Sequence, residues 1–481
     1  MNNIIILNHN FAIGTLFFIS TLFIIIGVYY SRKFRGITNY LVANRSMGLY
    51  SLTSSLVASA LGTWILFGPS SAATWGGIGA VMGYALGTAF PLFLLIKLGK
   101  KVRDQYPEGH TFTEMVRLKF GKKIFKLILL LSIFYMTIFL IAEVTAVAIL
   151  IKYLSGTALW ITSIIIISSS LTYTLYGGLR ASILTDNIQF LMLIILLLIS
   201  FSFLIYFNST IFNFNYIYNN KPNLLSFSYY TNFTAGLTFF IAVSATNLFH
   251  QGNWQRVYAA KNNKILEKSL TISFLIIIPI VFIMGFTGLV AVSNNSNVVP
   301  DLAFFSLLIN EQGIIISLVI VFLAISLTVS SIDTLINAIS SLIVVDAKHI
   351  INFKEDSLKL SKKLLIFISL ITFIVASKGL SILYLFLLAD LFCCSAVLSI
   401  FFGFYKNNFD EKRIFVSILA GLFTGLLFFP APDFSKSFLI GFVIPIKYFP
   451  LYITQSLLFI SFIVATFLPI CFWKTKLKNI K

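Results

Sequence analysis

The stretch Val321–Val345 reads VFLAISLTVSSIDTLINAISSLIVV, and it decides the fold class of the chain. An apolar run of this length with one charged residue, Asp333, has the dimensions of a membrane-spanning helix. Four polar residues recur along it at steps of four, three and four: Ser330, Thr334, Asn337 and Ser341. At these steps the four side chains share one face of the helix.

This polar face has two explanations. Hydroxyls and amides are costly in hydrocarbon unless they face protein, water or an ion. The face therefore indicates either a helix that lines a cavity deep in a bundle or a helix that packs against neighbours through small polar residues. A cavity of this kind would suit a hard cation, because such ions take oxygen ligands. The stripe alone leaves both explanations open.

The composition sets the broad class. The chain has 481 residues, of which 58% are hydrophobic and only 11% are charged, whereas soluble domains carry about a quarter charged residues. We therefore predict an all-α polytopic membrane protein that forms a single transmembrane domain over residues 1–481 in the lipid bilayer. The net charge of +19 does not indicate nucleic-acid binding, because Lys and Arg concentrate in short loops between apolar segments.

Hydropathy and charge together predict about thirteen transmembrane helices. Their expected ranges are 11–30, 48–68, 72–96, 124–153, 157–176, 184–207, 233–254, 267–292, 313–346, 362–377, 380–402, 413–430 and 452–473. The segment Phe438–Ile446 is too short to span and is expected to be a surface or re-entrant piece.

The charges next to these spans predict the orientation. No charge precedes the first span, and Arg32, Lys33 and Arg35 follow it, so we expect the N-terminus outside. With that start the basic loops and the tail Lys474–Lys481 lie on the cytoplasmic side of a cell (inner) membrane. The longest loop, Asn208–Asn232, is too short for a soluble domain, which leaves a transporter, a channel or an intramembrane enzyme.

Two spans carry matching interruptions. Gly62, Thr63, Gly68 and Pro69 make a poor continuous helix in the second span, although a simple packing kink explains them as well. The seventh span contains Thr246–Trp254, which is rich in hydrogen-bonding side chains. Two interrupted spans five helices apart indicate an inverted-repeat transporter. We expect an extra helix and loop at 1–47, repeats at 48–207 and 233–402, and C-terminal helices at 403–481.

Ionisable residues within the spans are few, and each is a functional hypothesis by default. They are Glu143, Asp186, His250, Asp333 and Asp390. A purely structural explanation pairs Asp186 with the nearby Arg180 and leaves Glu143 and Asp390 neutral and hydrogen-bonded. Because no Ser-His-Asp group, HExxH, phosphate loop or Cys/His cluster is present, we do not expect an enzyme.

Four segments in order resemble the sodium:solute symporter family. Gly177–Gln189 (GGLRASILTDNIQ) resembles its GGLRA…TDxxQ signature, and Tyr40–Gly48 resembles the segment after its first span. Trp254–Lys261 resembles its QRxxAAK segment. Val329–Thr334, with Ser340, Ser341 and Asp346 after it, resembles its MSTxDS…SS…D helix.

The resemblance implies a leucine-transporter-like, five-plus-five inverted-repeat core that works by alternating access. It also implies a coupling sodium ion (Na+) between the first and eighth core helices. The matching ligands are the carbonyls of Ala58, Leu61 and Leu327 and the hydroxyls of Ser330 and Ser331.

Coupling residues follow from the same resemblance and from the buried charges. Asp186 matches a family aspartate associated with cation coupling, and Asp333 and Glu143 are further candidates. The chain has Ala60 and Gly62 where some family members have Asp or Ser. The predicted sodium site therefore has fewer side-chain oxygens available as ligands. Proton coupling through His250 and Glu143 therefore stays an alternative.

The solute is predicted from weaker signals. His250–Arg256 (HQGNWQR) and His110–Gly121 resemble segments of the family's urea active transporter branch. The expected solute is a small polar molecule such as urea or a similar amide, with proline or another amino acid as the alternative. Candidate solute-binding residues are Thr63, Trp64, Asn247, His250 and Gln251. A channel or a transport-fold sensor remains possible as a different class, and no obligatory protein partner is evident.

Overall fold

The computed structural model describes residues 6–32, 37–207, 214–295, 297–308, 314–350, 357–405, 410–434, 437, 439–440 and 456–471. Within these ranges the chain is almost entirely helical, and pairing between extended segments is limited to isolated bridges such as Met47 with Ala260. The tail Lys474–Lys481 and all of Phe438–Ile446 except residues 439–440 lie outside the described residues.

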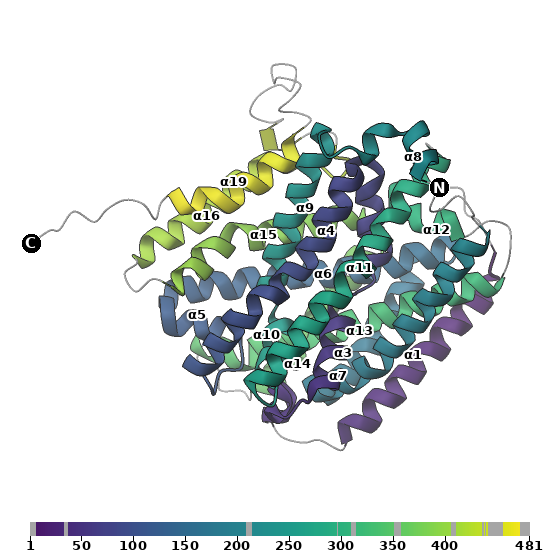
Figure 1. Cartoon of the computed structure of the whole chain (residues 1–481). Coiled ribbons are helices and arrows are strands. Elements are labelled where there is room, and N and C mark those ends of the chain that lie inside the picture. The colour runs from purple at the N-terminus through teal and green to yellow at the C-terminus, as the bar shows by residue number, and fades with distance from the viewer. Residues whose placement is uncertain are drawn as a thin grey trace, which may run out of the picture.

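The helices follow the predicted spans in order (Figure 1). Their bounds are α1 His9–Arg32, α2 Ile37–Val42, α3 Leu49–Ala60, α4 Trp64–Gln105, α5 Phe112–Phe120, α6 Lys122–Ser155, α7 Leu159–Phe207, α8 Phe214–Asn220, α9 Tyr230–Phe249, α10 Gln251–Ala259, α11 Asn263–Asn294, α12 Ala303–Leu308, α13 Ile314–Asp346, α14 Ser357–Ala376, α15 Ile382–Gly403, α16 Glu411–Phe428 and α19 Leu457–Cys471. Short 3-10 turns lie at Ala43–Arg45, Pro222–Leu225, Pro300–Leu302 and Ala347–His349.

The long helices have the dimensions of membrane spans. Among the described residues, 8 helices are long and apolar enough to cross a membrane, and Leu159–Thr172 and Leu457–Cys471 are shorter apolar helices. Each of the thirteen predicted ranges overlaps one of the helices above. The all-α polytopic class is therefore confirmed, whereas the repeat boundaries at 48–207 and 233–402 stay a prediction.

Helices α4 and α7 each contain one glycine with a positive φ, which separates two helical segments. Gly77 in α4 has φ 54° and ψ −153°, and Gly178 in α7 has φ 58° and ψ −164°. A positive φ favours a residue without a Cβ, so each glycine marks the end of one span and the start of the next. The boundary that hydropathy placed near residues 68–72 therefore lies at Gly77. Gly68 and Pro69 lie inside α4, close to its start at Trp64, and do not end the helix.

Glycines also set how closely the central helices approach. Helix α4 packs along α9 and α11. A Cβ added to Gly83 of α4 would collide with the backbone of Gly236 in α9, and one added to Gly288 of α11 would collide with the backbone of Ser70. Such close contacts through small residues are the usual way in which helices associate in membranes.

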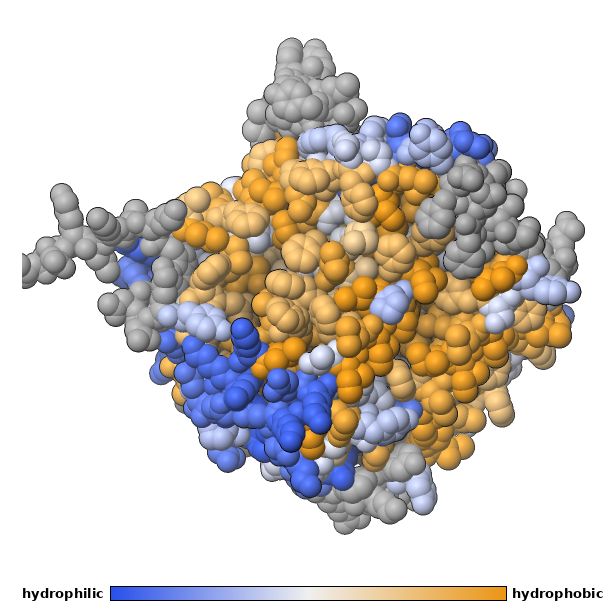
Figure 2. Space-filling model, in the orientation of Figure 1, coloured by the Kyte–Doolittle hydropathy of each residue, from blue (hydrophilic) through white to orange (hydrophobic). Residues whose placement is uncertain are grey.

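The surface has the pattern of a membrane protein. Figure 2 shows a broad band of hydrophobic side chains across one face, with a hydrophilic patch near α5 and the lower ends of α4 and α11. Several hydrogen bonds tie this end of the bundle together: Arg103 donates to the Val257 carbonyl, and Asn263 donates to Asp104. The basic loops of α4, α10 and α11 thus meet at one end, as the charge pattern predicts.

The contact between α4 and α9 yields a test. We expect Gly83→Ala to lower the free energy of unfolding by about 1–3 kcal/mol, because the added methyl group meets the Gly236 backbone and overpacks the interface. The melting temperature in detergent measures this. Gly14→Ala is the control, since nothing lies within 4 Å of a Cβ at that position. Equal melting temperatures for the two variants would contradict the close approach.

Candidate functional site

The first interruption lies between α3 and α4, at residues 61–63. Helix α3 ends with the Leu61 N–H donating to the Val57 carbonyl at 2.9 Å. The Thr63 N–H, at the start of α4, donates to Glu143 Oε2 on α6 at 3.0 Å. The Thr63 hydroxyl is hydrogen-bonded to the Thr328 hydroxyl on α13. Two other helices therefore hold this break, and Glu143 places a carboxyl at the positive N-terminal end of α4.

The second interruption lies between α9 and α10, at His250. Its backbone is extended, with φ −61° and ψ 110°, and its Nδ1 accepts the Gly252 N–H at 3.1 Å. The carbonyls freed at the end of α9 receive donors from α10. Asn253 donates to the Asn247 carbonyl and Trp254 to the Leu248 carbonyl, each at 2.8 Å. Side chains within the same segment thus satisfy the polar groups of this break.

A cavity of about 50 Å³ lies between the two interruptions. Trp64, Asn247 and His250, which the sequence predicts as solute-binding residues, line it. The carboxyl groups of Glu143 and Asp390 line it as well. The cavity therefore brings together polar groups from α4, α6, α9, α15 and the α9–α10 break.

The other two predicted solute-binding residues lie beside this cavity rather than among the residues that line it. Thr63 is fully buried, and its bonds go to Glu143 and Thr328. Gln251 Oε1 accepts the Phe112 N–H at 2.8 Å, and its amide donates to Ser341 at 3.2 Å. Their role in binding stays a prediction.

The predicted sodium ligands lie at the end of α3 and on α13, and their role stays a prediction. Ser331 lines the cavity, and its hydroxyl donates to the Leu327 carbonyl at 3.1 Å. The Ser330 hydroxyl donates to Asp186 Oδ1 at 2.7 Å. Ala58 and Leu61 are both buried at the end of α3. A Cβ added to Gly62 would touch Ser331 Oγ, so α3 and α13 lie in direct contact at this point.

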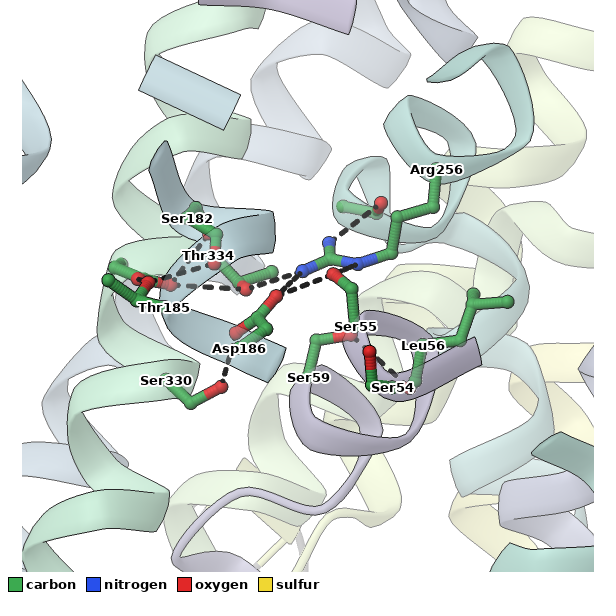
Figure 3. A network of polar contacts seen from close by, with 12 residues as sticks. Ser54, Ser55, Leu56, Ser59, Ser182, Thr185, Asp186, Arg256, Ser330 and Thr334 are labelled. Carbon is green, nitrogen blue, oxygen red and sulfur yellow. Dashed lines mark hydrogen bonds and ion pairs between the residues drawn. The ribbon is translucent and has the colours of Figure 1, made fainter. Parts of the chain in front are cut away.

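A buried ion pair joins α7 and α10 next to α3 and α13 (Figure 3). Arg256 of α10 donates to Asp186 of α7 at 2.8 Å, and both side chains have 0% exposure. Arg256 also donates to Ser55 at 2.8 Å and to Thr334 at 3.1 Å. The guanidinium therefore joins α3, α7, α10 and α13 in one network.

This network corrects one sequence expectation. The partner of Asp186 is Arg256 and not Arg180, whose guanidinium instead donates to Ser46 at 2.8 Å and to the Ala43 carbonyl at 3.3 Å. Arg180 lies six positions before Asp186 along α7, which is not a spacing that brings two side chains to one face of a helix.

The other two buried acids that the sequence analysis named within the spans, Asp333 and Asp390, have different surroundings. Asp333 accepts hydrogen bonds from Ser182 at 3.0 Å and from Thr185 at 3.4 Å, and so faces α7 rather than the cavity. Asp390 accepts one from Thr246 at 2.6 Å and lines the cavity. Sequence reasoning noted Asp390 as a buried charge without assigning it to the site.

Apart from Trp64, the aromatic residues of the cavity wall were not predicted from the sequence. Tyr84, Phe139 and Phe386 line the cavity, and Tyr84 stacks on Trp64 with the ring centroids 5.9 Å apart. The chain contains 51 Phe and 20 Tyr residues, so no single aromatic position stands out in the sequence.

The buried ion pair can be tested by a double-mutant cycle. We expect Arg256→Met to lower the free energy of unfolding by about 3–5 kcal/mol, because it leaves Asp186 buried without its cation. Adding Asp186→Asn should recover part of that loss, and the melting temperatures of the four proteins measure the coupling. Arg413→Met is the control, since its pair with Asp410 is exposed and contributes about 0–1 kcal/mol. Additive losses would show that the pair does not act as a unit.

Comparisons with known proteins agree with this architecture. A curated relative is the spermidine transporter DUR31 of Candida albicans, 26% identical over 437 residues that cover 88% of this chain and 79% of that protein. The urea active transporter of Saccharomyces cerevisiae is 25% identical over 182 residues, 38% of this chain and 25% of that protein. The sodium/glucose cotransporter 4 of Danio rerio is 28% identical over 176 residues, 35% of this chain and 26% of that protein.

Solved structures share the fold. A Na+-coupled sialic acid symporter superimposes with a TM-score of 0.70 at 16% identity, covering 95% of this chain and 98% of that chain. Mhp1, a nucleobase-cation-symport-1 family transporter, superimposes with a TM-score of 0.55 at 14% identity, covering 92% of this chain and 95% of that chain. The predicted leucine-transporter-like fold is confirmed.

The model of the sodium:solute symporter family matches residues 40–421, which is most of the chain. The helical bundle, the two interrupted helices and the four ordered motifs agree with that match. The coupling ion is sodium. This chain is therefore a multi-pass membrane transporter, not an enzyme, and it belongs to the sodium:solute symporter family.

Proposed function

We propose that the chain imports urea or a similar small amide together with sodium, by alternating access at the cavity between its two interrupted helices. The observation that carries this proposal is the cavity itself, which is small and combines hydrogen-bond acceptors and donors at membrane depth. In alternating access, one helix bundle rocks against the other and exposes a fixed central site to each side in turn.

The cavity volume favours a very small solute. A buried water needs about 10–15 Å³ of such volume, so 50 Å³ corresponds to the space of a few waters. Urea has this size. A hexose does not fit the cavity in this conformation.

The polar groups match those of a small amide. The carboxyl groups of Glu143 and Asp390 offer acceptors for the N–H groups of the solute. His250 Nδ1 already accepts the Gly252 N–H, so a neutral ring carries its proton on Nε2 and offers a donor for a carbonyl oxygen. Asn247 adds an amide at the same wall.

The same groups argue against a carboxylate-bearing solute such as proline. None of the described residues that line the cavity is Lys or Arg. The buried Arg256 is paired with Asp186. A solute carboxylate would therefore enter next to two acidic groups without a cationic side chain to pair with, and its desolvation would be uncompensated.

A protonated amine is the second candidate. Two carboxyl groups on one small cavity would suit an organic cation, and aromatic walls such as Trp64 add favourable contacts with a positive charge. The similarity to a spermidine transporter favours this class. Spermidine itself is too long for the cavity in this conformation, so a smaller amine fits better.

Sodium is proposed to bind between α3 and α13. The ligands would be the carbonyls of Ala58, Leu61 and Leu327 and the hydroxyls of Ser330 and Ser331. An inward-negative potential contributes about 2.3 kcal/mol per 100 mV for each sodium moved across the membrane. Asp186 bonds to Ser330, so we propose that it senses the ion through that hydroxyl. Asp333, which lies on α13 and faces α7, is proposed to act as a more distant coupling residue.

Orientation follows from the basic loops. We propose an outside N-terminus and a cytoplasmic C-terminus in the cell membrane, since the charged ends of α4, α10 and α11 meet at one end of the bundle. Accessibility of single cysteines introduced at residues 8 and 221 would test this side assignment.

The function is tested by uptake into proteoliposomes. We expect an inward sodium gradient to drive accumulation of labelled urea above equilibrium, with no accumulation under a potassium gradient. Labelled methylammonium, spermidine and proline form the comparison set. Sodium-driven uptake of an amine but not urea would favour the second candidate. Acceleration by an inward proton gradient alone, with no sodium effect, would indicate proton coupling, and downhill flux without any coupling would indicate a channel.

The sodium site has its own test. We expect Ser331→Ala to raise the sodium concentration for half-maximal uptake by about three- to tenfold, because one oxygen ligand worth roughly 0.5–1.5 kcal/mol is lost. Ser326→Ala is the matched control, since Ser326 lies on the same helix, is buried and is no part of the proposed site. An unchanged sodium dependence in Ser331→Ala would contradict the assignment.

A further inference from the structure

We propose that Glu143 supplies an additional oxygen ligand to the coupling sodium ion, in the space that Gly62 leaves open. The inference rests on the proposed function, because it assumes a sodium ion at the α3–α4 break. It goes beyond that function in adding a carboxylate from α6 to the ligands. The same carboxylate would then touch both the ion and the transported solute.

The geometry at Gly62 carries the proposal. A Cβ added to Gly62 would meet two oxygens from different helices, Ser331 Oγ of α13 and Glu143 Oε1 of α6. These two oxygens therefore converge on the one residue of the break that has no side chain. A serine at this position would bring its own hydroxyl to the same place. In this chain the carboxyl of Glu143 occupies that place instead.

The orientation of the carboxyl is fixed by its other oxygen. Glu143 Oε2 accepts the Thr63 N–H at 3.0 Å, which holds the group against the start of α4. Oε1 is then the oxygen that faces Gly62 and Ser331. The side chain is 1% exposed, so bulk solvent does not compete for it. A hard cation held at the break would gain an oxygen ligand from α6.

Charge balance supports the same conclusion. Among the described residues, no Lys, Arg or His forms an ion pair with Glu143. A carboxylate buried without a compensating cation is costly, and the N-terminus of α4 supplies only a partial charge. A sodium ion between α3 and α13 would be the missing partner. Conversely, the carboxylate would compensate for the oxygens that Ala60 and Gly62 do not provide.

The position of Glu143 has a consequence for the coupling between sodium and the solute. Glu143 lines the solute cavity as well as the break. Sodium bound beside Oε1 would hold this carboxyl group in place as an acceptor for a solute N–H. Without sodium, the same group has lost its cation and binds the solute less well. The ion and the solute would therefore each favour binding of the other through one side chain.

The test measures sodium binding directly and does not depend on transport. Purified protein is titrated with sodium, and binding is followed by retention of labelled sodium and by tryptophan fluorescence, since Trp64 lies at the break. The variants are Glu143→Gln, Glu143→Ala, Gly62→Ser and the double variant Glu143→Ala with Gly62→Ser. Glu267→Gln, which removes an exposed carboxyl of α11, is the control.

We expect Glu143→Gln to weaken sodium binding by about tenfold or more, because a charged ligand becomes a neutral one. Gly62→Ser alone should also weaken it, since the new side chain collides with Glu143 and Ser331. The double variant removes the collision with Glu143 and leaves only the Ser331 hydroxyl to turn aside, so the serine hydroxyl in the vacated place should restore sodium binding to at least about threefold above that of Glu143→Ala.

The outcomes separate the two proposals. Sodium binding by Glu143→Gln at the wild-type level, or a double variant no better than Glu143→Ala, would overturn the role of Glu143 and leave the proposed symport intact. Absence of sodium binding in the wild-type protein would overturn the proposed site itself. If Glu143→Gln does not yield folded protein, sodium binding by Gly62→Ser tests the proposal instead. Wild-type sodium affinity in Gly62→Ser would contradict the convergence of the two oxygens at Gly62.

Discussion

The rest of this structure depends on one constraint, namely that a helix interrupted at membrane depth must find partners for its free backbone groups. At the α3–α4 break the Thr63 N–H reaches the Glu143 carboxyl, and the Trp64 ring donates to the Ala60 carbonyl at 3.1 Å. The Thr63 hydroxyl meets Thr328 on α13. These bonds keep polar groups together in an apolar bundle, and the cavity lies where they meet.

The backbone groups at the two interruptions have different kinds of partner, and this difference affects how each break responds when helices move. At the α9–α10 break the partners are close in sequence, because Asn253 and Trp254 cap the end of α9 themselves. At the α3–α4 break the partners belong to α6 and α13. The carbonyls at the end of α9 are therefore satisfied locally, whereas the first break depends on how α3 and α4 sit against other helices. Rocking of these helices would change the bonds of the first break and leave the Asn253 and Trp254 bonds of the second intact.

The sequence predicted the spans and both breaks because hydropathy and glycine content are local signals. The polar face of α13 turned out to serve packing and site together: Ser330 and Thr334 bond to Asp186 and Arg256, whereas Ser331 and Thr334 line the cavity. No local signal could choose between those roles. The pairing of Asp186 with Arg256, and the arrival of Asp390 and Phe386 from α15, depend on tertiary packing that a pattern within one helix does not contain.

The distribution of charge explains why a strongly basic chain can have an acidic centre. The sequence holds 35 Lys and Arg against 16 Asp and Glu, yet the described residues that line the cavity include two carboxyl groups and no Lys or Arg. Basic residues gather in the loops, where they set orientation in the membrane. Arg256 is instead buried inside the bundle, where it forms an ion pair with Asp186. Glu143 and Asp390 are therefore the acidic groups that face the cavity, and among the described residues that line it no Lys or Arg balances them.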